Sequence, residues 1–311
     1  LTADEERYLS ANQFIITERL SFNDMGSALD DIYVKDLPVF ISSDAILYAL
    51  HLSYDKILMR LEAVLMRQNL ADALDAMYNA IPELAERYAD VDSLHMPLAD
   101  ADLFICIAKS LLDDVPVTPH IVSTDVFDAV WPAVKSEQYC QMPLFCERVR
   151  NLDFSQLTPR GHYVKPYSFE YADAGLDTYF RSMMWLGRID FLMTAPEEIP
   201  PWNESDIRRM CYDAVLVNEL LEMSGANDLL EENNSIIDMM VGKSDNLTPH
   251  ELADILRDTG VISVVNLMDD MVYDKFSEAL IQSSVSGQRI LSSIFATDPV
   301  LSESMELPVS Y

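Results

Sequence analysis

The sequence is short of glycine, which makes up 8 of its 311 residues, well below the ~7% that is average for proteins. β-Sandwiches and Rossmann-type folds need many tight turns and glycine-rich loops, so the shortage disfavours both. The 15 prolines can separate helices instead. No uninterrupted apolar run approaches the ~20 residues that a membrane-spanning helix needs. These absences favour a helical protein with few, proline-marked connections.

Several motifs that indicate particular classes of enzyme are also missing. The sequence has no glycine-rich phosphate loop, no HExxH, no GxSxG and no CxxC pair. Nucleotide-dependent, zincin-type and α/β-hydrolase chemistries are therefore disfavoured, and we expect no cofactor. The four cysteines (Cys106, Cys140, Cys146 and Cys211) lack metal-type spacing. We expect free thiols, with a Cys140–Cys146 disulfide as the alternative in an exported protein.

Basic residues are scarce as well. Lys and Arg number 21 against 52 Asp and Glu, which gives a net charge of −31. Such a surface repels phosphate backbones and anionic lipid, so nucleic acid is excluded as a partner and membrane docking is disfavoured. The charge suits solubility, neutral or basic partners, and divalent cations.

Helical patterns dominate what is present. Thr2 and Glu5 form a capping box that predicts a helix of about 16 residues. Leu37–Ile41 is expected to be extended, and residues 139–172 form an ordered but irregular connection. Further helices are expected from Asp44 to about Gln68 and at about 70–88, 97–113, 121–138, 174–194, 204–224, 226–240, 249–259, 263–283 and 286–296. We therefore expect an all-α protein, a multi-helix globular array for which a toroid is one arrangement.

The domain organisation is less strongly marked. We expect residues 1–311 to form a single helical domain, or two closely packed halves that divide near the proline-rich stretch at 195–203. The chain begins at Leu1 without an initiator methionine or a signal-like segment. We therefore expect it to be a piece of a longer protein.

The helix that begins at Asp44 carries the most informative pattern. At 100° per residue, one broad apolar face is formed by Ile46, Leu50, Tyr54, Ile57, Leu61 and Val64. A polar seam consists of Asp44, Tyr48, His51, Asp55 and Glu62, with large apolar residues on both sides. Because burying a carboxylate costs several kcal/mol unless it is paired, we expect the seam to be enclosed and to have partners.

Three interpretations of the seam stay open. It can be an internal hydrogen-bond network that fixes helix packing. Asp44, His51 and Asp55, with His162 from a distant segment, are also candidate catalytic groups for acid–base chemistry. A weaker hypothesis is a divalent-metal site built from Asp44, His51 and Asp55. We do not assign metal binding to these residues.

Two other segments supply candidate ligand-binding residues. Arg181, Trp185 and Arg188 share one face of the helix that begins near Asp177. These arginines either pair with the seam or extend past the apolar helix to the surface. Arg160 and Tyr163 belong to Arg160-Gly-His-Tyr163, which combines a fork-shaped donor, an imidazole and a phenol. Such a loop can bind a carboxylate or sugar hydroxyls, transfer protons, or be locked by its own hydrogen bonds.

Several phrases in the sequence resemble the bacterial and archaeal domain-of-unknown-function family 3160. They are Leu37-Pro-Val-Phe-Ile-Ser-Ser-Asp44, Leu47-Tyr-Ala-Leu-His51 with Tyr54-Asp55, Pro159-Arg-Gly-His-Tyr163, Tyr179-Phe-Arg-Ser-Met-Met-Trp-Leu-Gly-Arg188, Val241-Gly-Lys-Ser-Asp245 with Leu247-Thr248, and Gly287-Gln-Arg289. The resemblance implies a helical protein that is exported, often as a lipoprotein, and hence placed in the periplasm or at the cell surface. It implies no activity.

Two functions from different classes follow. The first is a cell-envelope binding or scaffold module with a buried polar cleft and a glycan or protein partner. The alternative is a hydrolase-like enzyme that uses paired carboxylates and histidine on a glycan or similar substrate. The sequence does not decide whether the protein is an enzyme.

Overall fold

The computed structural model describes residues 1–15, 22–36, 43–165, 169–195, 200–244 and 246–283. The chain divides into two compact units, residues 1–58 and 59–311. The expected boundary at 195–203 falls inside the second unit and lies partly outside the described residues. The extended segment expected at Leu37–Ile41 and the helix expected at 286–296 also lie outside them.

The first unit contains α1 (Ala3–Asn12), α2 (Met25–Val34) and most of α3 (Ser43–Leu61). The capping box that starts α1 is confirmed, since Glu5 N donates to Thr2 Oγ1 and Thr2 N donates to Glu5 Oε2. The helix is shorter than expected because Gln13 adopts a left-handed conformation at φ 67°. Asp24 caps α2, a helix that the sequence patterns did not indicate.

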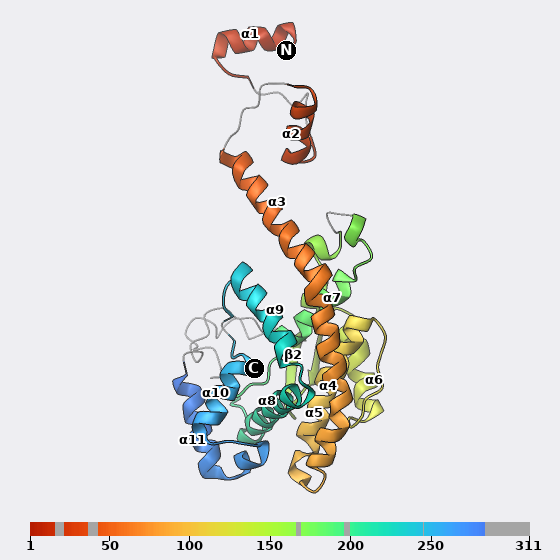
Figure 1. Ribbon diagram of the computed structural model, residues 1–311, viewed down its shortest axis with the longest axis vertical. Coiled ribbons are helices and arrows are strands. Elements are labelled where there is room, and N and C mark those ends of the chain that lie inside the picture. Colours follow the sequence, from red (N-terminus) through yellow and green to blue (C-terminus); the bar gives the residue numbers. More distant parts are fainter. Residues whose placement is uncertain (16–21, 37–42, 166–168, 196–199, 245, 284–311) are drawn as a thin grey trace. The chain divides into compact units, whose positions relative to one another are not determined.

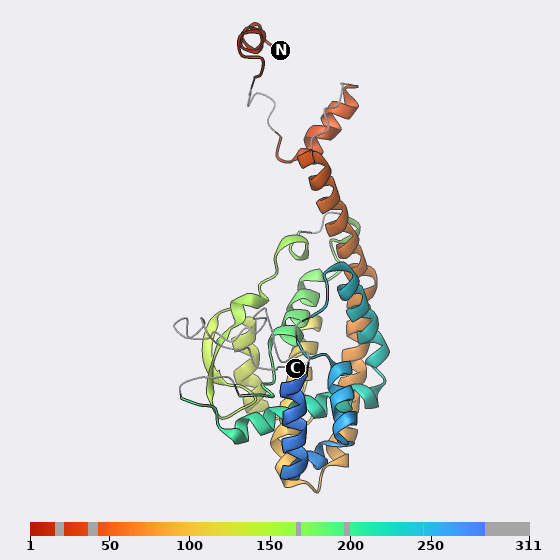
Figure 2. The ribbon, with the colours of Figure 1, turned by 90° about the vertical axis from the view of Figure 1, so that its left-hand side faces the viewer.

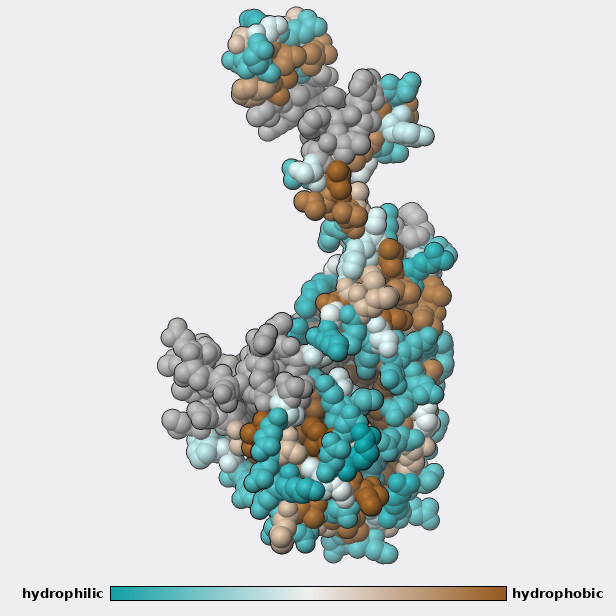
Figure 3. Space-filling view, turned by 60° about the vertical axis from the view of Figure 1, so that its left-hand side comes forward, coloured by the Kyte–Doolittle hydropathy of each residue, from teal (hydrophilic) through white to brown (hydrophobic). Residues whose placement is uncertain are grey.

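The apolar face of α3 is exposed in the first unit. Ile46, Leu50 and Ile57 are 52%, 61% and 53% exposed. The spacing of these residues was correctly recognised as one face, but the structure does not cover it. Figure 3 shows apolar side chains at the surface along this helix.

The second unit is built almost entirely from helices, as expected. They are α4 (Arg67–Arg87), α5 (His95–Asp113), α6 (Thr124–Lys135), α7 (Leu176–Arg188), α8 (Glu204–Ser224), α9 (Asn227–Met240), α10 (Pro249–Thr259) and α11 (Asp270–Gln282). Thr248 and Glu251 cap α10 reciprocally, with proline at the first helical position. This stop-and-start signal set the bounds of α10 correctly.

The break expected between Gln68 and residue 70 is absent. A π-helical turn at Glu62–Met66 joins α3 to α4, so the helix continues to Arg87. Residues 61–71 contain neither glycine nor proline, and nothing in this stretch ends a helix. Asn233 of α9 donates from Nδ2 to the Met66 carbonyl oxygen at 2.9 Å, which satisfies a backbone group at the turn.

The region expected to be irregular contains a hairpin. β1 (Tyr139–Pro143) pairs antiparallel with β2 (Val149–Asp153), with Tyr139 opposite Asp153 and Pro143 opposite Val149. Arg150 and Leu152 on β2 are buried. Short helical turns follow at Phe154–Leu157, Gly161–Tyr163 and Phe169–Tyr171. The alternation was too short to recognise as strand from the sequence.

The core of the second unit lies around α5, which packs against α4, α7 and α8 (Figures 1 and 2). Every residue from Ala101 to Ala108 is buried. Trp185 of α7 is fully buried and donates from its indole nitrogen to the Phe104 carbonyl oxygen at 3.0 Å. Aromatic rings continue the contact, with Phe104 and Phe191 5.1 Å apart between centroids. This packing fixes α7 on α5.

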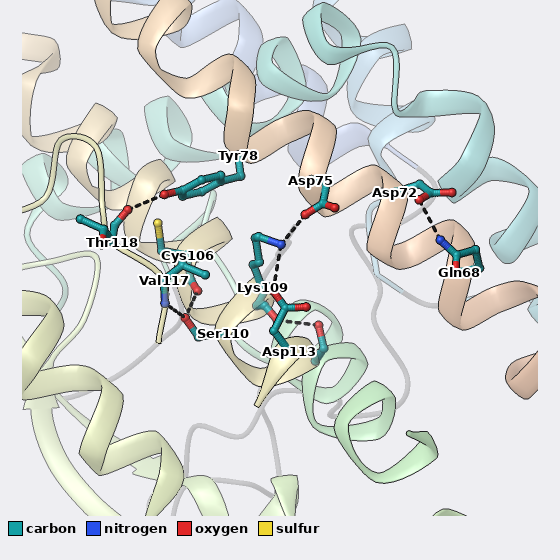
Figure 4. A network of polar contacts seen from close by, with 12 residues as sticks. Gln68, Asp72, Asp75, Tyr78, Cys106, Lys109, Ser110, Asp113, Val117 and Thr118 are labelled. Atoms are coloured by element: carbon teal, nitrogen blue, oxygen red, sulfur yellow. Dashed lines mark hydrogen bonds and ion pairs between the residues drawn. The ribbon is translucent and has the colours of Figure 1, made fainter. Parts of the chain in front are cut away.

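Polar contacts tie α4 to α5 at the edge of this core (Figure 4). Lys109 of α5 pairs with Asp75 of α4 and, at 2.9 Å, with Asp113. Tyr78 of α4 donates to the Thr118 carbonyl oxygen at 2.6 Å. These contacts hold the segment that follows α5 against α4.

Three ionisable residues meet inside the second unit, where α5 contacts α8. Arg209 binds Asp100 with two hydrogen bonds, of 2.6 and 2.9 Å. Among the described residues, neither carboxyl oxygen of Asp213 has a hydrogen-bond partner. Burial and then the charge of Asp100 raise the pKa of Asp213 well above its ordinary value of 3.8.

All four cysteines are free, and Cys106, Cys146 and Cys211 are buried.

Because its pKa is raised, Asp213 lowers the stability of the fold as the pH rises. Above about pH 4 the unfolded state gives up a proton that folded Asp213 keeps, so the free energy of unfolding decreases as pH rises. Asp213→Asn removes this titration and should be more stable than the wild type near pH 7 by about 1 kcal/mol or more. Urea unfolding between pH 4 and 8 measures the difference.

The control for this prediction is Asp128→Asn, which neutralises an exposed aspartate of α6. It should not change the slope of stability against pH. A wild type and an Asp213→Asn variant with parallel pH profiles would contradict the prediction.

Candidate functional site

Glu62, at the start of the π-helical turn, is the one residue of the polar seam that is buried. His162 Nε2 lies 2.6 Å from Glu62 Oε2, and the Tyr163 hydroxyl donates to Glu62 Oε1 at 2.6 Å. Glu62 and His162 are 4% and 5% exposed. The seam therefore does have partners from the Arg160–Tyr163 segment, but they meet at Glu62.

The turn at Gly161–Tyr163 brings these two side chains to Glu62. Gly161 has φ 61°, a conformation that a side chain would strain. The Tyr163 ring packs 4.7 Å from the Phe180 ring of α7, and the Arg160 guanidinium lies 5.4 Å over the same ring. The loop is held by its own backbone hydrogen bonds, from Tyr163 N to the Arg160 carbonyl oxygen and from Val164 N to the Gly161 carbonyl oxygen, as well as by Glu62 and Phe180.

The other seam residues belong to the first unit. Asp44 and His51 are exposed, and Asp55 is partly buried. The expected enclosure is therefore wrong for Asp44 and His51, because the buried side of α3 there is marked by Ala45 instead. Catalytic roles for Asp44, His51, Asp55 and His162 remain predictions.

The expected pairing of Arg181 with the seam is also wrong. Arg181 Nε donates to Glu137 at 2.8 Å and its Nη1 to Asp177 at 3.0 Å. Glu137 lies between α6 and β1, and Asp177 lies on α7, so neither acid belongs to the seam. Trp185 is committed to the core contact with Phe104. Arg188, the last residue of α7, lines a cavity.

That cavity, about 240 Å³ in volume, lies among α4, α5, α7, α8 and α9. Its lining is mainly apolar and is formed by Leu70, Ala73, Leu74, Met77, Phe104, Ile105, Met183, Leu186, Val217, Leu221 and Leu230. Polar groups from Asn234, Ser244 and Thr248 lie along one side, in α9 and the segment before α10. An apolar cavity with a few polar groups is the usual form of a small-molecule site.

Arg188 and Asp190 are the charged residues among the described lining of this pocket. Asp190 is buried and paired, since its Oδ1 lies 3.2 Å from Nη2 of Arg150 on β2. Burial lowers the pKa of the Arg188 guanidinium, and the nearby charge of Arg160 lowers it further. An arginine nevertheless stays protonated in proteins. The pocket thus carries a cation whose neighbouring acid is already engaged.

The sequence did not reveal this pocket. Its apolar lining comes from separate helices and looks like ordinary core, and Asn233, which also borders it, holds α9 on the π-helical turn. Two of the quoted phrases do contribute, one through Gly187 and Arg188 and the other through Ser244, Leu247 and Thr248. They could have pointed to a shared site, but only the fold shows that they are neighbours.

Within the described part of the chain, no group of three or more His, Cys, Asp or Glu residues is placed to hold a metal ion. No helix of the described residues is long and apolar enough to cross a membrane.

The model of a protein family described as "Protein of unknown function (DUF3160)" matches residues 2–307. The chain belongs to this family. The resemblance to this family is therefore confirmed, and the family description assigns no activity. Neither the curated proteins nor the solved structures contain a match to this family member.

The Glu62 cluster should be a stability element of the fold. Glu62→Ala leaves the buried His162 and the Tyr163 hydroxyl without their partner and should lower the free energy of unfolding by about 3 kcal/mol. Tyr163→Phe removes one of the two hydrogen bonds and should cost about 1–2 kcal/mol. Urea unfolding midpoints measure both changes.

Tyr139→Phe is the matched control, because it removes a hydroxyl that donates to exposed Asn151. Its cost should stay below about 0.5 kcal/mol. If Glu62→Ala unfolds at the same urea concentration as the wild type, the cluster does not stabilise the fold.

Proposed function

We propose that this protein is a binding module of the cell envelope whose pocket takes a small, mainly apolar ligand. The observation that carries the proposal is the cavity of about 240 Å³ that is bordered by five helices and lined mainly by apolar side chains. Side chains of a packed core normally fill such space. Leaving it open forfeits contacts that a ligand can restore.

The envelope location rests on the family resemblance and remains part of the proposal. The net charge of −31 would keep an exported protein soluble and would oppose docking on anionic lipid. A glycan is a poorer fit to this pocket than an apolar molecule, because hydroxyl groups facing Leu, Met and Phe side chains would lose their hydrogen bonds to water.

The hydrolase alternative receives less support. His162 is buried and its Nε2 is engaged by Glu62, so this imidazole serves the fold. Asp44 and His51 belong to the other compact unit. No specific observation favours a reaction over binding.

Gly187 offers a direct test of the pocket. It lines the cavity on α7, and a Cβ at this position would meet no other heavy atom within 4 Å. Gly187→Phe should therefore obstruct the pocket without disturbing packed side chains. Gly187→Ala is the matched control and should raise helix stability by up to about 1 kcal/mol.

Binding of octanol and octanoate, measured by calorimetry, distinguishes the outcomes. The wild type and Gly187→Ala should bind at least one probe, and Gly187→Phe should bind it at least about tenfold more weakly. The proposal fails if the wild type binds neither probe, or if a folded Gly187→Phe variant binds as well as the wild type.

A further inference from the structure

Arg188 differs from the other arginines that are buried or half-buried among the described residues. Each of the others donates a hydrogen bond to an oxygen of the chain, and they are Arg67, Arg148, Arg150, Arg181, Arg208 and Arg209. Arg188 makes no hydrogen bond or ion pair to any described residue, although the protein has 52 acidic side chains. A partly buried guanidinium without an acceptor loses hydration that nothing in the described chain replaces.

Among the described residues, the acids around Arg188 are paired with other groups. Asp190 is the one carboxylate in the described lining of the pocket, and Arg150 holds it through both Oδ1 and the backbone carbonyl. Asp177 at the start of α7 and Glu137 between α6 and β1 both bind Arg181. Arg160 adds a second positive charge near Arg188. A locally positive site thus lies at an apolar pocket of a strongly acidic protein.

We infer that the pocket selects a monocarboxylate with an apolar body, whose carboxylate binds Arg188; this inference rests on the proposed function. The planar fork of one guanidinium matches a carboxylate with two parallel hydrogen bonds. A phosphate dianion would need further donors to balance its charge. The side chains of Leu74, Met77 and Leu186 receive the apolar body.

The size of the cavity limits that body. A dry apolar cavity of roughly 150 Å³ binds benzene, which has six carbon atoms, so a cavity of about 240 Å³ has room for a body of about eight carbon atoms. Octanoate is therefore a suitable probe. Octanol has the same chain length and no charge, so the pair isolates the contribution of the carboxylate.

The experiment compares the affinities of octanoate and octanol at pH 7 in four proteins: the wild type, Arg188→Gln, Arg188→Lys and Arg257→Gln. The wild type should bind octanoate at least about tenfold more tightly than octanol, because the alcohol lacks the charge-assisted bonds. Arg188→Gln should abolish this preference while leaving octanol binding unchanged. Arg188→Lys should keep part of it, because charge remains but the fork is lost.

Arg257→Gln is the control for the loss of one positive charge. Arg257 is exposed on α10 and pairs with Asp254, so the preference for octanoate should survive its replacement. Thermal unfolding checks that each variant is folded. If Arg188→Gln does not fold, Arg188→Lys takes its place in the comparison.

Failure of this inference can be told apart from failure of the proposed function. If the wild type and Arg188→Gln bind octanol equally well, and the wild type binds octanoate no more tightly than octanol, the carboxylate inference is overturned while the pocket stands. If a preference persists unchanged in folded Arg188→Gln, Arg188 is not the carboxylate site. If the wild type binds neither molecule, the proposed function itself is wrong.

Discussion

The ion pair between Arg150 and Asp190 is the interaction on which the electrostatics of the pocket depend. It joins the hairpin to the end of α7, and both partners are buried. Breaking such a pair would leave an uncompensated charge in the interior, so the arrangement is strongly fixed. Asp190 is paired with Arg150, and Arg188, two residues earlier, has no ion pair among the described residues. One structural contact thereby leaves a cation at an apolar cavity.

Carboxylates on the other side of α7 are also paired with other side chains. Glu62 is held by His162 and Tyr163, and Arg181 is held by Glu137 and Asp177. Trp185 anchors α7 on α5 between them. Each of these groups is satisfied within the second unit, so they keep the helix in place beside the pocket. π-Helical turns such as Glu62–Met66 often lie near functional sites, and here Asn233 links that turn to α9, which borders the cavity.

Local signals predicted the helices well, and long-range pairings poorly. The capping pattern of Thr248 and Glu251 set the start of α10, and Gly260 ends the same helix in a left-handed conformation. The hairpin was missed because five-residue strands carry little periodicity. The amphipathic pattern of α3 showed that Glu62 and His51 share a stripe, but it could not show that the helix buries only the later of the two. That outcome depends on which elements cover each turn of the helix.

The candidate site was predicted only in fragments. Arg188 and His162 were singled out for their chemistry, yet the structure gives them different surroundings, a cavity for one and a buried glutamate for the other. Pairing of Arg150 with Asp190 joins residues 40 apart. No spacing rule reaches that far, so it became clear only from the structure that Arg188 has no partner among the described residues.

The most direct test of the account is methyl NMR of the methionine-labelled protein during titration with octanoate. Met77 and Met183 line the pocket, whereas Met239 and Met271 are 74% and 83% exposed and lie outside its lining. The account predicts saturable shifts of the Met77 and Met183 methyl signals, with Met239 and Met271 unchanged. Shifts confined to Met239 or Met271, or no shift at any concentration, would contradict it.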